Sequence, residues 1–331
     1  MAKVTGLGDN LYIAGYDISG DVGALGKVSG SHAVKEVTCI DKYAVERLAL
    51  TRDGEIGFTG WFDTATGAIH AALNSLPSTD VLLTYARGTT RGSPAACVIA
   101  KQASYDVNRE VGGALSVACQ GVGNGAGLDW GLQLTAGKET IAGAGNSTGV
   151  DFGMADSIGT VPVATIASTS NSVANPTSIL FPSLHGLVSG DSINVSGQAS
   201  GTPLINGDFQ ATFVDTTHVT VPVNVTVIGG SATIAKTSTD YGAAMYVQVF
   251  AVPSNSITIK VQTSADNGAS DAFVDVAGLT TTAISGQSAG LRIVSTSSTA
   301  IIRRYARIVT SGTFSNAVVN VVLVRYGASG S

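Results

Sequence analysis

Hydrophobic and polar residues alternate along several segments of this chain. Residues 56–62 have the sequence IGFTGWF, and residues 115–120 have the sequence LSVACQ. A period of two is the pattern of a β-strand whose two faces meet different surroundings. These segments predict a β-sheet in a first domain of residues 1–150, which ends in a glycine- and serine-rich stretch at 143–149.

A single segment shows helical spacing instead. Its apolar residues at positions 69, 73 and 76 follow an i, i+4, i+7 pattern, and Pro77 can end the helix. Thr64 or Thr66 can cap its start. The sequence therefore predicts an all-β protein with one short helix near residues 66–76.

Residues 158–236 differ from the flanking sequence in being nearly free of charge. They hold three acids and one base, and Val, Thr, Ser and Gly dominate. From His218 onward, valines at 219, 221, 223, 225 and 227 alternate with other residues, which predicts a strand with one buried face. We expect a separate small β-module here.

The remaining sequence predicts a β-sandwich of the jelly-roll or immunoglobulin-like type over residues 237–331. Its six apolar segments are AAMYVQVFAV, SITIKVQTS, AFVDVAG, LRIVST, IIRRYARIVTS and AVVNVVLVRY. Their spacing is typical of a sandwich. The segment VDFG at 150–153 is a candidate first strand, so residues 151–157 are assigned to the sandwich and residues 158–236 become an insertion in one of its loops.

Composition narrows the class of protein. Of 331 residues, 41 are Gly and only 12% are charged, which fits a β-rich protein with many turns and is too apolar for disorder. No apolar run approaches the roughly 20 residues of a membrane-spanning helix, and we expect no secretory signal. Three cysteines without a C-x-x-C spacing suit a reducing compartment.

The net charge and the sequence motifs argue against catalysis and against nucleic-acid binding. The net charge is −5, and residues 1–150 hold 11 basic and 14 acidic side chains. The motif GQSAG lacks a later histidine, GVGNGA lacks a helix behind it, and the four histidines have no metal-ligand spacing. We therefore expect no catalytic, metal or cofactor site.

One basic and aromatic cluster is a candidate outer binding face. In a strand, Arg303, Tyr305 and Arg307 share one face and Arg304 takes the other. Such a ladder can hold acidic sugars or the carboxylates of a neighbouring subunit. The alternative is a solvated sheet face whose arginine stems cover apolar surface.

The order of motifs over roughly the first 125 residues resembles the major tail tube proteins of long-tailed bacteriophages. The matching motifs are GYDISGD, ERL with RDGEI and GWFD, the helical segment, and LLTYARGTTRGSPAA. The inserted segment resembles a small β-module of phage virion proteins and adhesins, through HGL, GDSINVSG and INGDF. IKVQTSADNG and RRYARIV resemble galactose-binding-like modules of phage tail proteins.

The resemblance implies a structural virion protein, assembled in the host bacterial cytoplasm. Its copies would form hexameric rings that stack into a tail tube, contact other tail proteins and let DNA pass through an acidic or neutral lumen without specific binding. Inter-ring contacts would come from residues 2–10 and 27–52. The candidate charged residues in the second segment and directly after it are Lys35, Glu36, Asp41, Lys42, Glu46, Arg47, Arg52 and Asp53.

Other functions remain open at this point. A surface adhesin that binds carbohydrate or a receptor is the main alternative, although residues 158–331 contain no Trp. A capsid decoration or tail terminator protein is an alternative within the virion. An enzyme is the least expected class.

Overall fold

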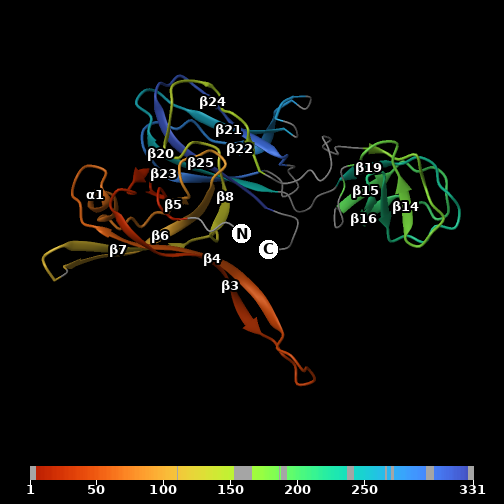
Figure 1. The fold of residues 1–331 in the computed structure, drawn as a ribbon, viewed down its shortest axis with the longest axis horizontal. Coiled ribbons are helices and arrows are strands. Elements are labelled where there is room, and N and C mark those ends of the chain that lie inside the picture. Colours follow the sequence, from red (N-terminus) through yellow and green to blue (C-terminus); the bar gives the residue numbers. More distant parts are fainter. Residues whose placement is uncertain are drawn as a thin grey trace.

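The computed structural model describes residues 5–109, 111–152, 166–185, 187, 192–236, 242–264, 267–269, 272–295 and 302–326. Within these ranges the protein is almost wholly β, and its one α-helix is α1 (Ile69–Leu73) (Figure 1). The predicted all-β class is confirmed. The helix lies inside the predicted range but is shorter than expected.

The first part of the chain forms one strongly bent sheet around strand β6. The strands are β1 (Asn10–Ile13), β2 (Tyr16–Asp17), β3 (Val22–Glu36), β4 (Arg47–Trp61), β5 (Val81–Ala86), β6 (Pro94–Arg109) and β7 (Leu115–Gly123). The first half of β6 pairs with β5 and belongs to a sheet with the strand order β2-β1-β5-β6. Its second half pairs with β7 and belongs to a sheet with the order β6-β7-β4-β3. This bend separates a four-stranded sheet, β3-β4-β7-β6, from the rest.

The alternation at residues 56–62 and 115–120 places the core as the sequence predicts. Ile56 and Phe58 of β4 and Val117 and Cys119 of β7 are buried in one apolar cluster. The helix packs on this cluster through Ile69.

The predicted helix caps are wrong. The residue before α1 is Ala68, which makes no side-chain cap, and the N–H of Ile69 donates instead to the Asp21 carboxylate at 2.8 Å. A carboxylate from a distant turn thus replaces Thr64 or Thr66 as the acceptor at this helix end.

Residues 27–52, the second of the expected inter-ring segments, form most of a β-hairpin. Strands β3 and β4 pair from Val22 opposite Gly60 to Glu36 opposite Arg47, with three irregularities in register. The hairpin extends well away from the body of the protein (Figure 1). We call residues 32–50 the arm.

The C-terminal part is a two-sheet sandwich built from all six predicted segments. Its strands are β20 (Ala243–Ala251), β21 (Thr258–Ser264), β22 (Val274–Thr280), β23 (Ser288–Val294), β24 (Tyr305–Ser311) and β25 (Ala317–Arg325). One sheet has the order β24-β21-β22, and β25, β20 and β23 form the other. Alternate side chains of both sheets fill a single core between them.

Earlier residues also belong to this sandwich. Strands β9 (Glu139–Ile141), β10 (Gly145–Asn146) and β11 (Val150–Asp151) pair with β25 or β24. The pairing of β11 matches the expected first strand at 150–153. The boundary placed at residue 150 is wrong in detail, because residues 139–146 lie in the sandwich sheets.

A continuous sheet joins the first domain to the sandwich. Strand β8 (Asp129–Gln133) pairs with β6 on one side and with β25 on the other. Gln248 of β20 is fully buried at this joint, where its amide donates to the Leu82 carbonyl at 2.8 Å and accepts the N–H of Gly15 at 2.9 Å. The sandwich is thus joined to the first domain by buried hydrogen bonds as well as by strand pairing.

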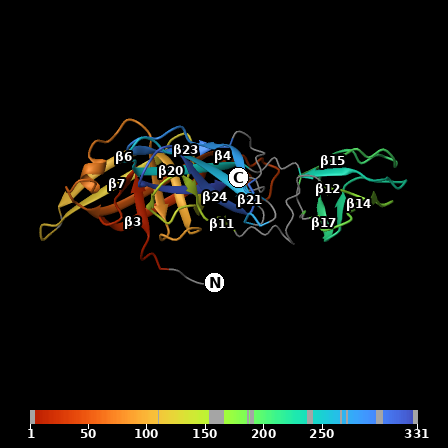
Figure 2. The same cartoon turned by 90° about the horizontal axis from the view of Figure 1, so that it is seen from above.

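Residues 166–236 form two further four-stranded sheets. The strands are β12 (Ile166–Ala167), β13 (Ser170–Asn171), β14 (Thr177–Leu180), β15 (Ser192–Ser196), β16 (Gly207–Gln210), β17 (Thr212–Asp215), β18 (His218–Val221) and β19 (Thr233–Lys236). They pair only with one another among the described residues and enclose their own apolar cluster. Figure 2 shows this module as a compact body of its own.

The single long strand expected over residues 219–227 is wrong. Strand β18 ends at Val221, because Pro222 has no N–H for a ladder and bends the chain. Val219, Val221 and Val225 are buried, whereas Val227 is exposed. The valines keep their spacing of two beyond the end of β18, but they no longer all lie on one buried face.

Replacing residues 158–236 with a short Gly-Ser linker will leave the other strands folded. The module contributes no strand to the remaining sheets, and the entropy of closing a loop changes slowly with its length. Circular dichroism and thermal unfolding of the deletion variant check this. An aggregated variant, together with an isolated module that fails to fold, would contradict it.

Candidate assembly surface

The four-stranded sheet β3-β4-β7-β6 has an open edge on each side. On one side, β3 pairs only with β4. On the other side, β5 covers β6 only over residues 95–100, while β7 occupies the opposite edge of residues 100–109. Within the described part of the chain, no strand pairs with these outer edges. Exposed rows of backbone N–H and C=O groups are templates for pairing with another chain.

The two faces of this sheet differ. One face carries the buried cluster, and the other carries the side chains that alternate with it. On this second face, Lys27 forms an ion pair with Glu55, and Gln120 donates to the same carboxylate at 2.7 Å. Lys101 pairs with Asp80 at 2.8 Å. This face also carries the half-exposed Trp61, and the two lysines on it are paired with carboxylates.

The arm is exposed along its whole length and carries apolar side chains that nothing in the described chain covers. Ile40 and Tyr43 at its tip are fully exposed, at 109% and 108%, and Val34, Leu48 and Leu50 are about half exposed. A two-stranded ribbon is only marginally stable in water by itself. Such a ribbon with apolar residues is suited to burial against another protein surface.

All eight predicted inter-ring charged residues lie on the arm or at its root, but they do not form one cluster. Those on the arm and its turn are Lys35, Glu36, Asp41, Lys42, Glu46 and Arg47, all exposed. Lys42 pairs with Glu46 at 3.6 Å within the turn. Arg52 and Asp53 lie at the root, where Arg52 pairs with Asp129 at 3.0 Å. Arg52 thus has an intramolecular role that its sequence position did not indicate.

The turn between β6 and β7 is a second projection, which the sequence did not predict. It extends from the far end of the sheet (Figure 1), and Val107, Val111 and Leu115 are exposed there. The signal that was available is the run YDVNREVGGAL, whose apolar residues stand beside a pair of glycines. Exposed apolar residues thus occur at both ends of the open-edged sheet.

The three cysteines provide a reporter of the arm. Cys39 lies exposed at the tip, whereas Cys97 and Cys119 are buried. Burial raises the pKa of the Cys119 thiol to about 12 and also raises the pKa of Cys97, so both stay protonated at neutral pH. The thiolate is the reactive form, so buried thiols of this kind are inert.

We predict that Ellman's reagent will label one thiol per chain in the native dispersed protein at pH 8. The labelled residue will be Cys39, and Cys39→Ser will abolish the reaction. Unfolding the protein in guanidinium will expose all three cysteines. Rapid labelling of two or three thiols in the native protein would contradict the burial of Cys97 and Cys119.

The predicted outer cluster is only partly assembled. Tyr305 and Arg307 lie on the outer face of β24, and Arg307 packs over the Phe273 ring at 4.1 Å and donates to Gln262 at 2.7 Å. Arg303 precedes the strand, so the three residues do not form one ladder. Arg304 also precedes it and pairs with Asp151 at 2.7 Å, so the prediction that it takes the opposite strand face is wrong.

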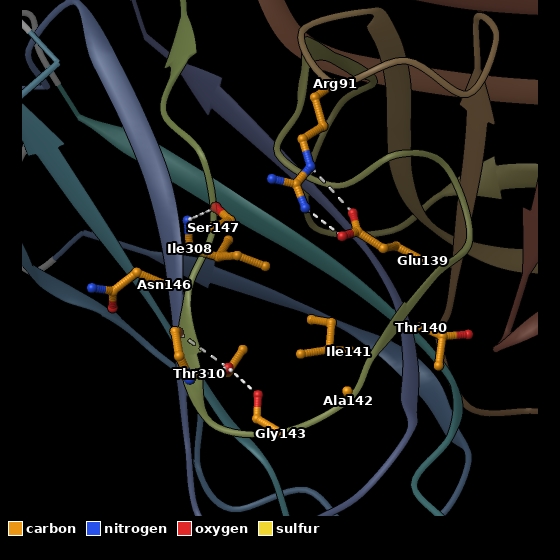
Figure 3. Close-up of a pocket in the computed structure, with 11 residues that line it drawn as sticks. Arg91, Glu139, Thr140, Ile141, Ala142, Gly143, Asn146, Ser147, Ile308 and Thr310 are labelled. Carbon is orange, nitrogen blue, oxygen red and sulfur yellow. Dashed lines mark hydrogen bonds and ion pairs between the residues drawn. The ribbon is translucent and has the colours of Figure 1, made fainter.

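A groove beside β9 and β10 shows no ligand chemistry (Figure 3). It has a volume of about 220 Å³, and its charged residues Arg91 and Glu139 form an ion pair with each other. Thr310 bonds backbone atoms of residues 143–145 at its far end. Among the described residues there is no group of three or more possible metal ligands. No helix in these ranges has the length and apolar character needed to cross a membrane.

Comparison with known proteins does not identify a family. No protein-family model matches the chain, and no curated protein matches it in sequence. One similar solved structure is the Dit protein (gp 19.1) of SPP1, described as a paradigm of the hub adsorption apparatus in phages that infect Gram-positive bacteria. It is 10% identical, and the match covers 98% of this chain and 100% of that chain with a TM-score of 0.26. This TM-score does not establish a shared fold, so function rests on the surfaces described above.

Proposed function

We propose that this chain is a structural virion protein, the major tail tube subunit of a long-tailed phage. The observation that carries the proposal is the sheet β3-β4-β7-β6 with its two open edges. If the β6 edge of one copy joins the β3 edge of the next, each copy uses both edges and a closed ring leaves none exposed. Such a surface serves assembly and requires no catalytic residues.

The second face of this sheet supports a lumen that DNA can pass. Each lysine or arginine that faces a DNA phosphate adds salt-dependent attraction. Lys27 and Lys101 are held by Glu55 and Asp80, and Asp106 on the same face adds negative charge. With this face inward, the sheet lines the channel without a ring of unpaired cations.

The arm supports contacts between rings. Its apolar tip and its charged turn need a partner surface, and a second ring of the same chain supplies one in every layer. Burying one large apolar side chain contributes about 1.5–3 kcal/mol, so the exposed arm residues are a substantial source of stacking energy. The module of residues 158–236 and the sandwich then lie outside the channel.

Negative-stain microscopy and light scattering of the purified protein test this proposal. We expect rings or stacked tubes whose abundance rises with protein concentration. Monomers at every concentration would count against it. Trimers that carry free modules would favour the alternative of a surface-binding adhesin.

A further inference from the structure

At the root of the arm, a buried carboxylate holds together the first domain and the sandwich. Arg52 of β4 donates to Asp129 of β8 at 3.0 Å and to the Leu128 carbonyl at 3.2 Å. Asp129 is 4% exposed, and its other oxygen accepts the hydroxyls of Tyr246 at 2.6 Å and Tyr326 at 3.0 Å. The Asp129 carboxylate therefore accepts hydrogen bonds from side chains of β4, of β20 and of the residue directly after β25.

A second arginine reaches this cluster through the tyrosines. The Nε of Arg292 donates to the Tyr246 hydroxyl at 2.9 Å, and its Nη2 donates to the Tyr326 hydroxyl at 2.7 Å. Burial raises the pKa of both tyrosines, so both hydroxyls are neutral at physiological pH. Within the described residues, Arg292 has no carboxylate within ion-pair distance. The cluster thus contains two guanidinium charges and one carboxylate.

The two arginines line a common cavity of about 510 Å³. Its other lining residues are Thr51, Asp129 and the glycine-rich loop of residues 123–127. A Cβ on Gly127 would lie 3.1 Å from the Cβ of Arg52, so glycine lets the loop pack against this side chain. Each guanidinium has five N–H donors, of which the bonds above use only some.

We propose that this cavity, the arm-root site, binds one oxyanion of the carboxylate or phosphate class between Arg52 and Arg292. The planar guanidinium fork matches the oxygens of such a group, and charge-assisted bonds to it are strong. One bound anion balances the second guanidinium charge. The anion is either free phosphate or an acidic side chain of a neighbouring copy, and only the second source rests on the proposed tube.

Calorimetric titration of dispersed protein with inorganic phosphate, at constant ionic strength against chloride, tests the site. We expect saturable binding that weakens at least tenfold in Arg292→Gln. The matched control is Arg304→Gln, which removes a surface arginine paired with Asp151 and will leave binding unchanged. Equal heats in phosphate and chloride, or undiminished binding in Arg292→Gln, would overturn the proposal.

A second variant keeps the test independent of the folding of Arg292→Gln. Thr51 is exposed and lines the cavity, so Thr51→Glu places a carboxylate at the site and will suppress phosphate binding in a folded protein. Retained binding in that variant would also contradict the proposal.

If assembly abolishes phosphate binding and phosphate slows assembly, a carboxylate of a neighbouring copy fills the site. If assembled tubes bind phosphate as well as the dispersed protein does, the arm-root site takes a free oxyanion. Phosphate binding without tubes would refute only the proposed function.

Discussion

Shortening the arm will leave single rings that do not stack into tubes. The variant removes residues 35–48 and joins Val34 to Ala49 through Asn-Gly. Val34 and Ala49 lie directly opposite each other in the hairpin. Asn-Gly is a favoured sequence for a two-residue hairpin turn. The edges of the sheet within residues 22–31 and 101–109 remain intact. Negative-stain microscopy will therefore show a loss of tubes with rings retained.

The fold should survive this change, because the buried residues of β4 begin at Gly54. The thermal unfolding midpoint of the shortened variant will remain close to that of the parent. Val227→Ser with Ile228→Ser is the matched control, since it removes two exposed apolar side chains from the module instead. Tubes of normal length from the shortened variant would contradict an inter-ring role for the arm.

Asp129→Ala will destabilise the protein by about 1–3 kcal/mol, the usual cost of leaving a buried hydrogen-bonding group without its partner. The substitution leaves Arg52 without its carboxylate and removes the acceptor of two tyrosine hydroxyls. Urea unfolding measures the change as a lower midpoint. Because the cluster links β4, β8 and β20, we expect the first domain and the sandwich to weaken together.

Asp275→Ala provides the comparison for this substitution. Asp275 pairs with Lys260 at 2.7 Å on an exposed sheet face, where ion pairs contribute little. Its unfolding curve will lie on that of the parent protein. Equal destabilisation by the two substitutions would contradict the special position of Asp129.

Strands with one buried face were predictable from the sequence. The alternation around Ile56 and Phe58 locates β4 and its core face, and the six apolar segments of the sandwich all form strands. In each case the period of two reflects a real difference between core and surroundings.

The arm and its root were not predictable in the same way. Both faces of residues 32–50 are exposed, so no alternation of apolar and polar residues marks the hairpin. The partnership of Arg52 with Asp129 joins residues 77 positions apart and depends on how β8 crosses the root. Similarly, Pro222 breaks a strand within a valine pattern that continues past it.

In the proposed ring, each copy joins the open edges of its four-stranded sheet to those of its neighbours. Amide hydrogen exchange, compared between dispersed and assembled protein, tests this claim most directly. We predict new protection on assembly in residues 22–31 of β3 and 103–109 of β6, with no change in residues 212–221 of the module. Assembled protein whose two sheet edges exchange as fast as in the dispersed state would contradict the claim.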